Sequence, residues 1–172
     1  MGFPDLTRVL TGVPWAVVGA AATRMYMPER ATRDLDIVVH THHASEARKR
    51  LLEAGYQMVG NLSIGGSSWT SPGGQEVDVL ESDAPWLGEA LSRAQANRDP
   101  QGLPVLPLPP LALMKTQAGR VQDLADVARM LGQASSAALD EVRSLFRRYA
   151  PEDLEDLESL ITLGQMETGP ER

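Results

Sequence analysis

The stretch that decides the fold is Trp15–His40, WAVVGAAATRMYMPERATRDLDIVVH. It begins with a continuous apolar run, Trp15–Val18, which is typical of a strand buried on both faces. Small residues follow at Gly19–Ala22, and small residues let a backbone approach another group closely. The next residues, to Tyr26, favour a short helix. A second strand, predicted over Thr32–Val39, completes the unit.

The second predicted strand carries two carboxylates. Asp34 and Asp36 alternate with the apolar residues Leu35 and Ile37. Because side chains alternate across a strand, both carboxylates project from the same face, roughly 7 Å apart at the backbone. Two carboxylates at that distance repel each other unless a cation lies between them. The pattern therefore predicts a cation site on this strand.

A third carboxylate, Asp78, follows in a later predicted strand, Glu76–Leu80. Oxygen ligands of this kind suit Mg²⁺ or Mn²⁺, and Mg²⁺ keeps its remaining positions for water and substrate phosphates. The turn after Val18 leads into a helix N-terminus, where free N–H groups favour an anion. Two metal ions and a held triphosphate are what the transfer of a nucleotide from an NTP requires. The three acids thus predict nucleotidyl transfer.

The remaining sequence predicts an α+β protein. A mixed β-sheet core flanked by helices is expected over residues 1–108, and a C-terminal helical subdomain over residues 109–172. The helical part is predicted as a long helix at Leu111–Leu131, followed by helices at Ser136–Tyr149 and Pro151–Leu163.

Composition restricts the class of protein. The 172 residues include no cysteine, which excludes disulfides and thiol chemistry. The net charge is −7, but residues 151–172 hold seven acids and one base, so the rest of the chain is nearly neutral. The sequence contains no basic stripe of the kind that binds a long polyanion. No signal peptide or membrane-spanning run is visible, and we expect a cytoplasmic protein without a membrane partner.

Taken together, residues 13–132 resemble the nucleotidyltransferase superfamily that includes DNA polymerase β. In that superfamily a Gly-Ser or Gly-Gly turn precedes a helix, an Asp-x-Asp strand and a third Asp on a neighbouring strand. The matching segments here are Val18–Ala22, Arg30–Ile37 and Val77–Leu80. The chain looks most like small bacterial AbiEii-type nucleotidyltransferases of toxin–antitoxin systems. Two sequence motifs are typical of these enzymes. The first is Arg-x-Thr-x-Asp-x-Asp, and the second is a late Lys-x-x-x-x-Arg-x-x-Asp-x-x-Asp, which this chain carries as Lys115, Arg120, Asp123 and Asp126.

The resemblance implies a role for each matching residue. Asp34 and Asp36 would bind the metal and connect it to the triphosphate of an NTP, with Asp78 as third ligand or as the base. Gly19 and Ala20 would hold phosphate through backbone N–H groups. The remaining positions would contact phosphate or support the site: Arg30, Thr32, Lys115 and, with less support from the sequence, Asp126 and Arg120.

One position departs from the superfamily pattern. The second residue of the turn is Ala20, which lacks the hydroxyl of the usual serine. Three functions therefore stay open. The first is a toxin-type enzyme that moves a nucleotide to tRNA or protein, with a possible cognate antitoxin as partner. The second is an aminoglycoside-type antibiotic nucleotidyltransferase, and the third is a non-catalytic nucleotide-binding or interaction module.

Aromatic residues and histidines provide further candidates. Trp69 follows a Gly-Gly pair and could stack on a base. His40, His42 and His43 could bind a transition metal, although no acid or cysteine stands near them with the spacing of a zinc site.

Overall fold

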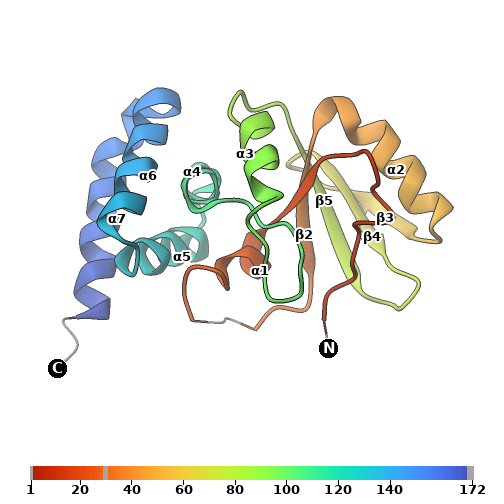
Figure 1. Ribbon diagram of the computed structural model, residues 1–172, viewed down its shortest axis with the longest axis horizontal. Helices are drawn as coiled ribbons and strands as arrows, with labels where there is room; N and C mark the ends of the chain where they lie inside the picture. The colour runs from red at the N-terminus through yellow and green to blue at the C-terminus, as the bar shows by residue number, and fades with distance from the viewer. Residues whose placement is uncertain (1, 29–30, 170–172) are drawn as a thin grey trace. The chain divides into compact units, whose positions relative to one another are not determined.

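The structure, a computed structural model, describes residues 2–28 and 31–169. The chain divides into two compact units (Figure 1). Unit 1 consists of Met1–Ala22 and Arg30–Leu106, and unit 2 of Thr23–Glu29 and Pro107–Arg172. A domain boundary after residue 108, as expected from the sequence, stays a prediction.

Unit 1 is built on a five-stranded sheet in the order β1-β2-β5-β4-β3. The strands are β1 (Trp15–Val18), β2 (Leu35–His40), β3 (Gln57–Asn61), β4 (Gly66–Thr70) and β5 (Glu76–Ser82). β2 and β5 are parallel, and the other neighbours are antiparallel. The sheet is therefore mixed. Together with the helices on the sheet and the helical segment after it, this confirms the predicted α+β class.

A helix covers the face of the sheet that carries the side chains of Leu35 and Val77. Leu35, Ile37, Val77 and Val79 are buried in the core of unit 1. The helix α2 (Ala44–Glu53) lies on this face, since its Arg48 forms an ion pair of 2.6 Å with Glu81 of β5, which alternation places beside Val79.

The remaining helical segments of unit 1 are short. They are α1 (Gly19–Thr23), which extends into unit 2, the 3₁₀ turn η1 (Thr41–His43) and α3 (Leu87–Ala94).

The two edges of the sheet differ. The outer side of β1 is covered by an extended segment, because Val17 N–H donates to Pro104 O at 2.7 Å and Leu106 N–H donates to Val17 O at 3.0 Å. Within this segment, Val105 forms an isolated parallel bridge with Val17. At the opposite edge, β3 pairs with β4, and Val59 is 68% exposed. The β3 side of the sheet is thus open to solvent.

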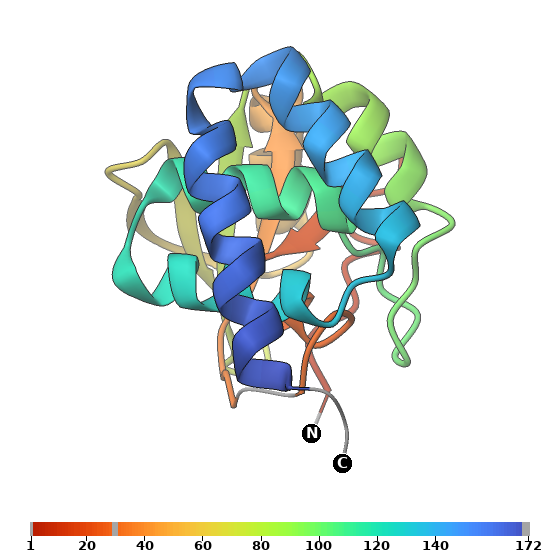
Figure 2. The ribbon, with the colours of Figure 1, turned by 90° about the vertical axis from the view of Figure 1, so that its left-hand side faces the viewer.

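Unit 2 contains four α-helices and a 3₁₀ turn. They are α4 (Leu108–Ala118), α5 (Val121–Gly132), α6 (Ser136–Tyr149), η2 (Pro151–Asp153) and α7 (Leu154–Thr168). Helices α5 and α7 pack closely (Figure 2), because Gly132 and Gly164 leave no room for a side chain between the two backbones. Ser135 caps the N-terminus of α6, since its hydroxyl accepts from Ala138 N–H at 3.2 Å. In the part of the chain that is described, no helix is sufficiently long and apolar to cross a membrane.

The prediction of one long helix over Leu111–Leu131 is wrong. The chain breaks at Gly119, whose φ of 67° ends α4 in the left-handed region, and Arg120 stands in extended conformation before α5. Glycine adopts this conformation at little steric cost, which makes it the usual residue just past a helix end. The segment is therefore two helices joined by a tight turn.

Candidate functional site

Two of the predicted site residues are direct neighbours in the sheet. Asp36 of β2 pairs with Asp78 of parallel β5. Neighbouring strands lie about 4.8 Å apart, and residues in register project from the same face. Both side chains are half-buried and belong to the face opposite α2. The sequence placed these acids 42 positions apart, and the parallel pairing brings them side by side.

Asp34 precedes β2 and is exposed, because the strand begins at Leu35 and not at Thr32 as predicted. Thr32 lies beside it, and its hydroxyl donates to the Asp34 carbonyl at 3.4 Å. Arg30 lies outside the described residues. Asp34 therefore stands on a less regular segment than Asp36 and Asp78.

The group that approaches the small-residue turn is the Asp36 carboxylate. Gly19 has a φ of +62°, and a Cβ built on it would overlap Oδ2 of Asp36. Val18, the last residue of β1, pairs with Asp36 in the sheet, which explains the contact. Only glycine satisfies both the left-handed backbone and the close contact at this position. Gly19 thus leaves room for the Asp36 carboxylate beside the turn. Ala20 follows it as a half-buried residue of α1.

The fit of a divalent metal depends on the ligands that the chain supplies. Among residues 2–28 and 31–169, no three or more His, Cys, Asp or Glu side chains converge into a group that could hold a metal ion. Mg²⁺, however, is usually held by one or two carboxylates together with substrate phosphates. The Asp36–Asp78 pair has the two carboxylates that such a site requires from the protein. The histidines at 40, 42 and 43 stack in sequence, with ring centroids 4.0 and 4.1 Å apart.

Lys115 lies in unit 2, where it connects α4 with α5. Its ammonium group donates to Asp123 Oδ1 at 3.1 Å and to Asp126 Oδ2 at 3.0 Å. The three side chains are only 6%, 6% and 0% exposed. We call this group, together with Arg120 and Gln122, the Lys115 network. The phosphate role that the resemblance implies for Lys115 stays a prediction.

Further donors saturate the two acids of the network. Arg120 Nε donates to Asp123 Oδ2 at 2.6 Å, and Gln122 Nε2 donates to Asp126 Oδ1 at 3.0 Å. Burial raises the pKa of Asp123, but the hydrogen bonds and positive charges of Arg120 and Lys115 outweigh it, so that its pKa is lowered. Arg120 and Asp123 therefore form an ion pair between residues three positions apart.

Trp69, considered above as a stacking platform, is a core residue. It is 1% exposed, and its indole N–H donates to the Ser67 hydroxyl at 2.8 Å. A buried tryptophan with a satisfied N–H cannot offer its face to a base.

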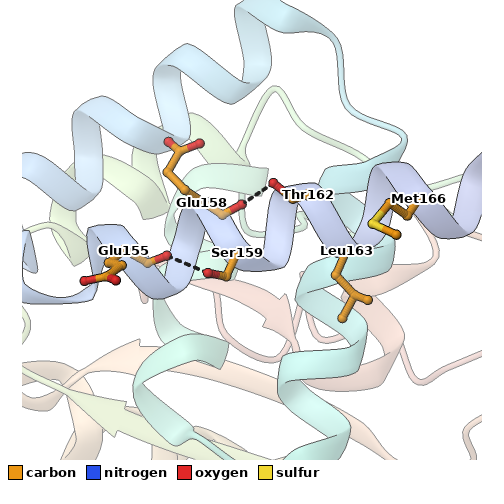
Figure 3. Close-up of a pocket in the computed structure, with 6 residues that line it drawn as sticks. All are labelled: Glu155, Glu158, Ser159, Thr162, Leu163 and Met166. Carbon is orange, nitrogen blue, oxygen red and sulfur yellow. Dashed lines mark hydrogen bonds between the residues drawn. The ribbon is translucent and has the colours of Figure 1, made fainter.

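A shallow pocket of about 580 Å³ lies along α7 (Figure 3). Glu155, Glu158, Ser159, Thr162, Leu163 and Met166 line it. Ser159 and Thr162 bond back to the carbonyls of Glu155 and Glu158, at 3.0 and 2.9 Å. Glu158 also pairs with Arg143 of α6 at 2.6 Å, which lowers the pKa of Glu158. The hydroxyls are therefore occupied within the helix, and sequence analysis had not singled out these residues as a site.

No protein-family profile matches the chain, and no curated protein matches it in sequence. Among solved structures, the chain is similar to the antibiotic-resistance factor ANT(2'')-Ia, in a crystal structure with adenylyl-2''-tobramycin. The identity is 15%, the TM-score is 0.47, and 92% of this chain and 90% of that chain are covered.

Two further similarities are of the same order. The lincosamide antibiotic adenylyltransferase LnuA, bound to lincomycin, has 12% identity and a TM-score of 0.46, with 82% of this chain and 90% of that chain covered. A CCA-adding enzyme with CTP has 13% identity and a TM-score of 0.42, with coverage of 92% and 46%. These neighbours are nucleotidyltransferases, but likenesses this distant assign no function. The function has to be inferred from the residues of this chain.

Proposed function

We propose that this protein is a Mg²⁺-dependent nucleotidyltransferase that moves a nucleotide from an NTP to an acceptor hydroxyl. The observation that carries the proposal is the pairing of Asp36 with Asp78 on one face of the sheet. Two carboxylates at neighbouring positions repel each other, and a cation bound between them removes this cost in stability. Gly19 supports the proposal, since it gives Asp36 its place beside the turn.

The residues divide the work of the reaction. Asp36 and Asp34 would hold Mg²⁺. When bound, this ion would neutralise negative charge on the triphosphate. Asp78 would take the proton of the acceptor hydroxyl. The hydroxyl oxygen forms a bond to the α-phosphorus, the bond from phosphorus to the bridging oxygen breaks, and pyrophosphate leaves. Gly19 and Ala20 would bind phosphate through their backbone.

The acceptor follows from the resemblance to AbiEii-type enzymes, which implies tRNA or protein and a toxin-type role with a cognate antitoxin. An aminoglycoside is the second candidate. Residues 151–169 contain six acids and no base, a composition that suits a polycationic substrate. The two candidates share the donor site and differ only in where the nucleotide is delivered.

The test is transfer of label from each of the four NTPs, with Mg²⁺, to total tRNA, to a protein mixture or to tobramycin. We expect one acceptor to be labelled by the wild type and not by Asp36→Ala. Asp83→Ala is the matched control, since Asp83 is an exposed acid of the same unit outside the paired row. Undiminished labelling by Asp36→Ala would remove the metal-site claim.

Thermal melting separates the enzyme from a non-catalytic module. Mg²⁺ and the correct NTP together should raise the melting temperature, because a ligand that binds the folded state stabilises it. If no NTP shifts the melting temperature and no acceptor is labelled, the proposed function is wrong. A shift without labelling would support the nucleotide-binding module to which Ala20 points.

A further inference from the structure

The row of site residues continues beyond the two carboxylates. The strand register places Asp36, Asp78, Ser68 and Gly60 next to one another on β2, β5, β4 and β3. Residues paired across neighbouring strands share a face of the sheet. Three strand spacings separate Asp36 from Gly60, about 14 Å. The carboxylates are therefore one end of a row that runs to the open edge of the sheet.

A β-bulge determines which residue ends the row. Met58 pairs with Trp69 and Gly60 pairs with Ser68, so that Val59 is the extra residue between them. In a regular ladder Val59 would stand opposite Ser68, with its branched side chain on the face of the carboxylates. Bulges are frequent beside active sites, where they redirect side chains. Here the bulge puts a glycine in place of a valine.

Gly60 is needed neither for backbone conformation nor for packing. Its φ is not positive, and a Cβ built on it meets no atom within 4 Å. A glycine inside a strand weakens the strand and often marks a place where a ligand comes close. The open space above Gly60 is consistent with this second explanation.

Ser68 differs from its neighbours on β4. Ser67 and Trp69 point to the opposite face, where they are buried and bonded to each other. Ser68 is half-buried on the carboxylate face, and its hydroxyl makes no hydrogen bond within the described residues. The Asp78 carboxylate likewise has no hydrogen-bond or ion-pair partner in the described part of the chain. Both groups are available to a ligand that lies across β5 and β4.

We propose that Asp78, Ser68 and Gly60 form the acceptor subsite, and that it takes a sugar ring whose reacting hydroxyl has a hydroxyl or an amine on the neighbouring carbon. This inference rests on the proposed function. One hydroxyl of the ring faces Asp78 and attacks the α-phosphorus, as above, and the neighbouring hydroxyl or amine forms a hydrogen bond with Ser68 Oγ. The ring then lies over Gly60, where a side chain would displace it. A ribose at an RNA end and an aminoglycoside sugar share this chemistry.

The experiment measures the KM for the acceptor and for the NTP separately, with total tRNA and tobramycin as acceptor probes. For Gly60→Val we expect the acceptor KM to rise about tenfold or more, with the NTP KM and the Mg²⁺–NTP melting shift unchanged. Valine is favourable in a strand, so this variant should fold. Gly88→Val is the matched control, because Gly88 is also open to solvent and lies in α3.

Ser68→Ala should raise the acceptor KM several-fold, and Ser68→Thr, which retains the hydroxyl, should recover part of the loss. Of the two acceptors, the one that the wild type labels identifies the source of the sugar. An unchanged acceptor KM in both Gly60→Val and Ser68→Ala would overturn the subsite while the proposed function stands. Labelling of protein instead of either sugar acceptor would overturn it as well. A wild type that labels nothing would remove the proposed function and the subsite together.

Discussion

The two acidic clusters of this protein differ in what neutralises them. In the Lys115 network, each buried carboxylate accepts hydrogen bonds from two different side chains. In the row on the sheet, Asp78 stands beside Asp36 with no described cation on its carboxylate. Buried charges persist when they are paired, whereas neighbouring carboxylates repel each other unless a cation lies between them. On the proposed function, the Lys115 network contributes to stability and the row on the sheet to the chemistry.

The largest effect on activity is expected from changing an acid of the row on the sheet. Asp78→Asn should reduce nucleotide transfer by about 1,000-fold, which corresponds to about 4 kcal/mol in the barrier. Its melting temperature should be equal to or higher than that of the wild type, because the change removes the repulsion with Asp36 and the Asp78 carboxylate has no partner to lose within the described residues. Transfer assays and thermal melting of the same preparation measure both. A melting temperature lower by many degrees would show that Asp78 is structural.

The next effect concerns the cation of the Lys115 network. Lys115→Met should lower the free energy of unfolding by about 3 kcal/mol, because it leaves two buried carboxylates without their shared partner. Denaturant unfolding measures this loss, with Lys49→Met on the exposed surface of α2 as control. An unchanged stability with a raised NTP KM would instead favour the phosphate role implied by the resemblance.

A smaller effect is expected at the contact between Gly19 and Asp36. Gly19→Ala and Gly12→Ala both place a side chain at positive φ, which costs about 1–2 kcal/mol in each case. Only at Gly19 would the new Cβ also meet Asp36, since a Cβ at Gly12 has no atom within 4 Å. Transfer activity should therefore fall in Gly19→Ala and persist in Gly12→Ala. Equal activity in the two variants would contradict the positioning of Asp36 by the turn.

The smallest expected effect is the acid sensitivity of the Lys115 network. The pKa of Asp123 is lowered in the folded state from its ordinary value of 3.8. A lowered folded-state pKa stabilises the protein above the ordinary value, and this contribution is lost as the pH falls below 3.8 and through the folded-state pKa. Unfolding midpoints measured from about pH 5 downward should show this loss in the wild type. Arg120→Ala should show a smaller one, and identical pH profiles would exclude the Arg120 contribution.

Alternation and composition were sufficient for part of the site. The period of two predicted the strand of Asp36, although Asp34 lies just before that strand and not within it as predicted. The apolar neighbours of Asp78 predicted another strand. Those patterns depend on single segments, so they can be found without knowing the fold. The α+β class followed in the same way, from strand-like segments in the first part of the chain and helical segments in the last.

The Lys115 network shows where local pattern fails. In the single long helix that the sequence predicts, Lys115 and Asp126 would share a face, because 11 residues are close to three turns. They do meet, but across two helices, because the chain turns at Gly119. Helical spacing cannot distinguish one continuous helix from two helices joined by a turn. Gly119 decides between them through its left-handed conformation, but a single glycine within a helical pattern is also tolerated in a continuous helix.

The sequence by itself determined which residues carry charge and which segments alternate. It thereby determined the strand of Asp36, the strand of Asp78 and the small-residue turn at Gly19. Only the tertiary structure decided that Asp36 and Asp78 are neighbours and that Ser68 and Gly60 continue their row. The physical reason is that strand register arises from long-range pairing and here includes a bulge at Val59. Neither the pairing nor the bulge is encoded in the period of any one segment.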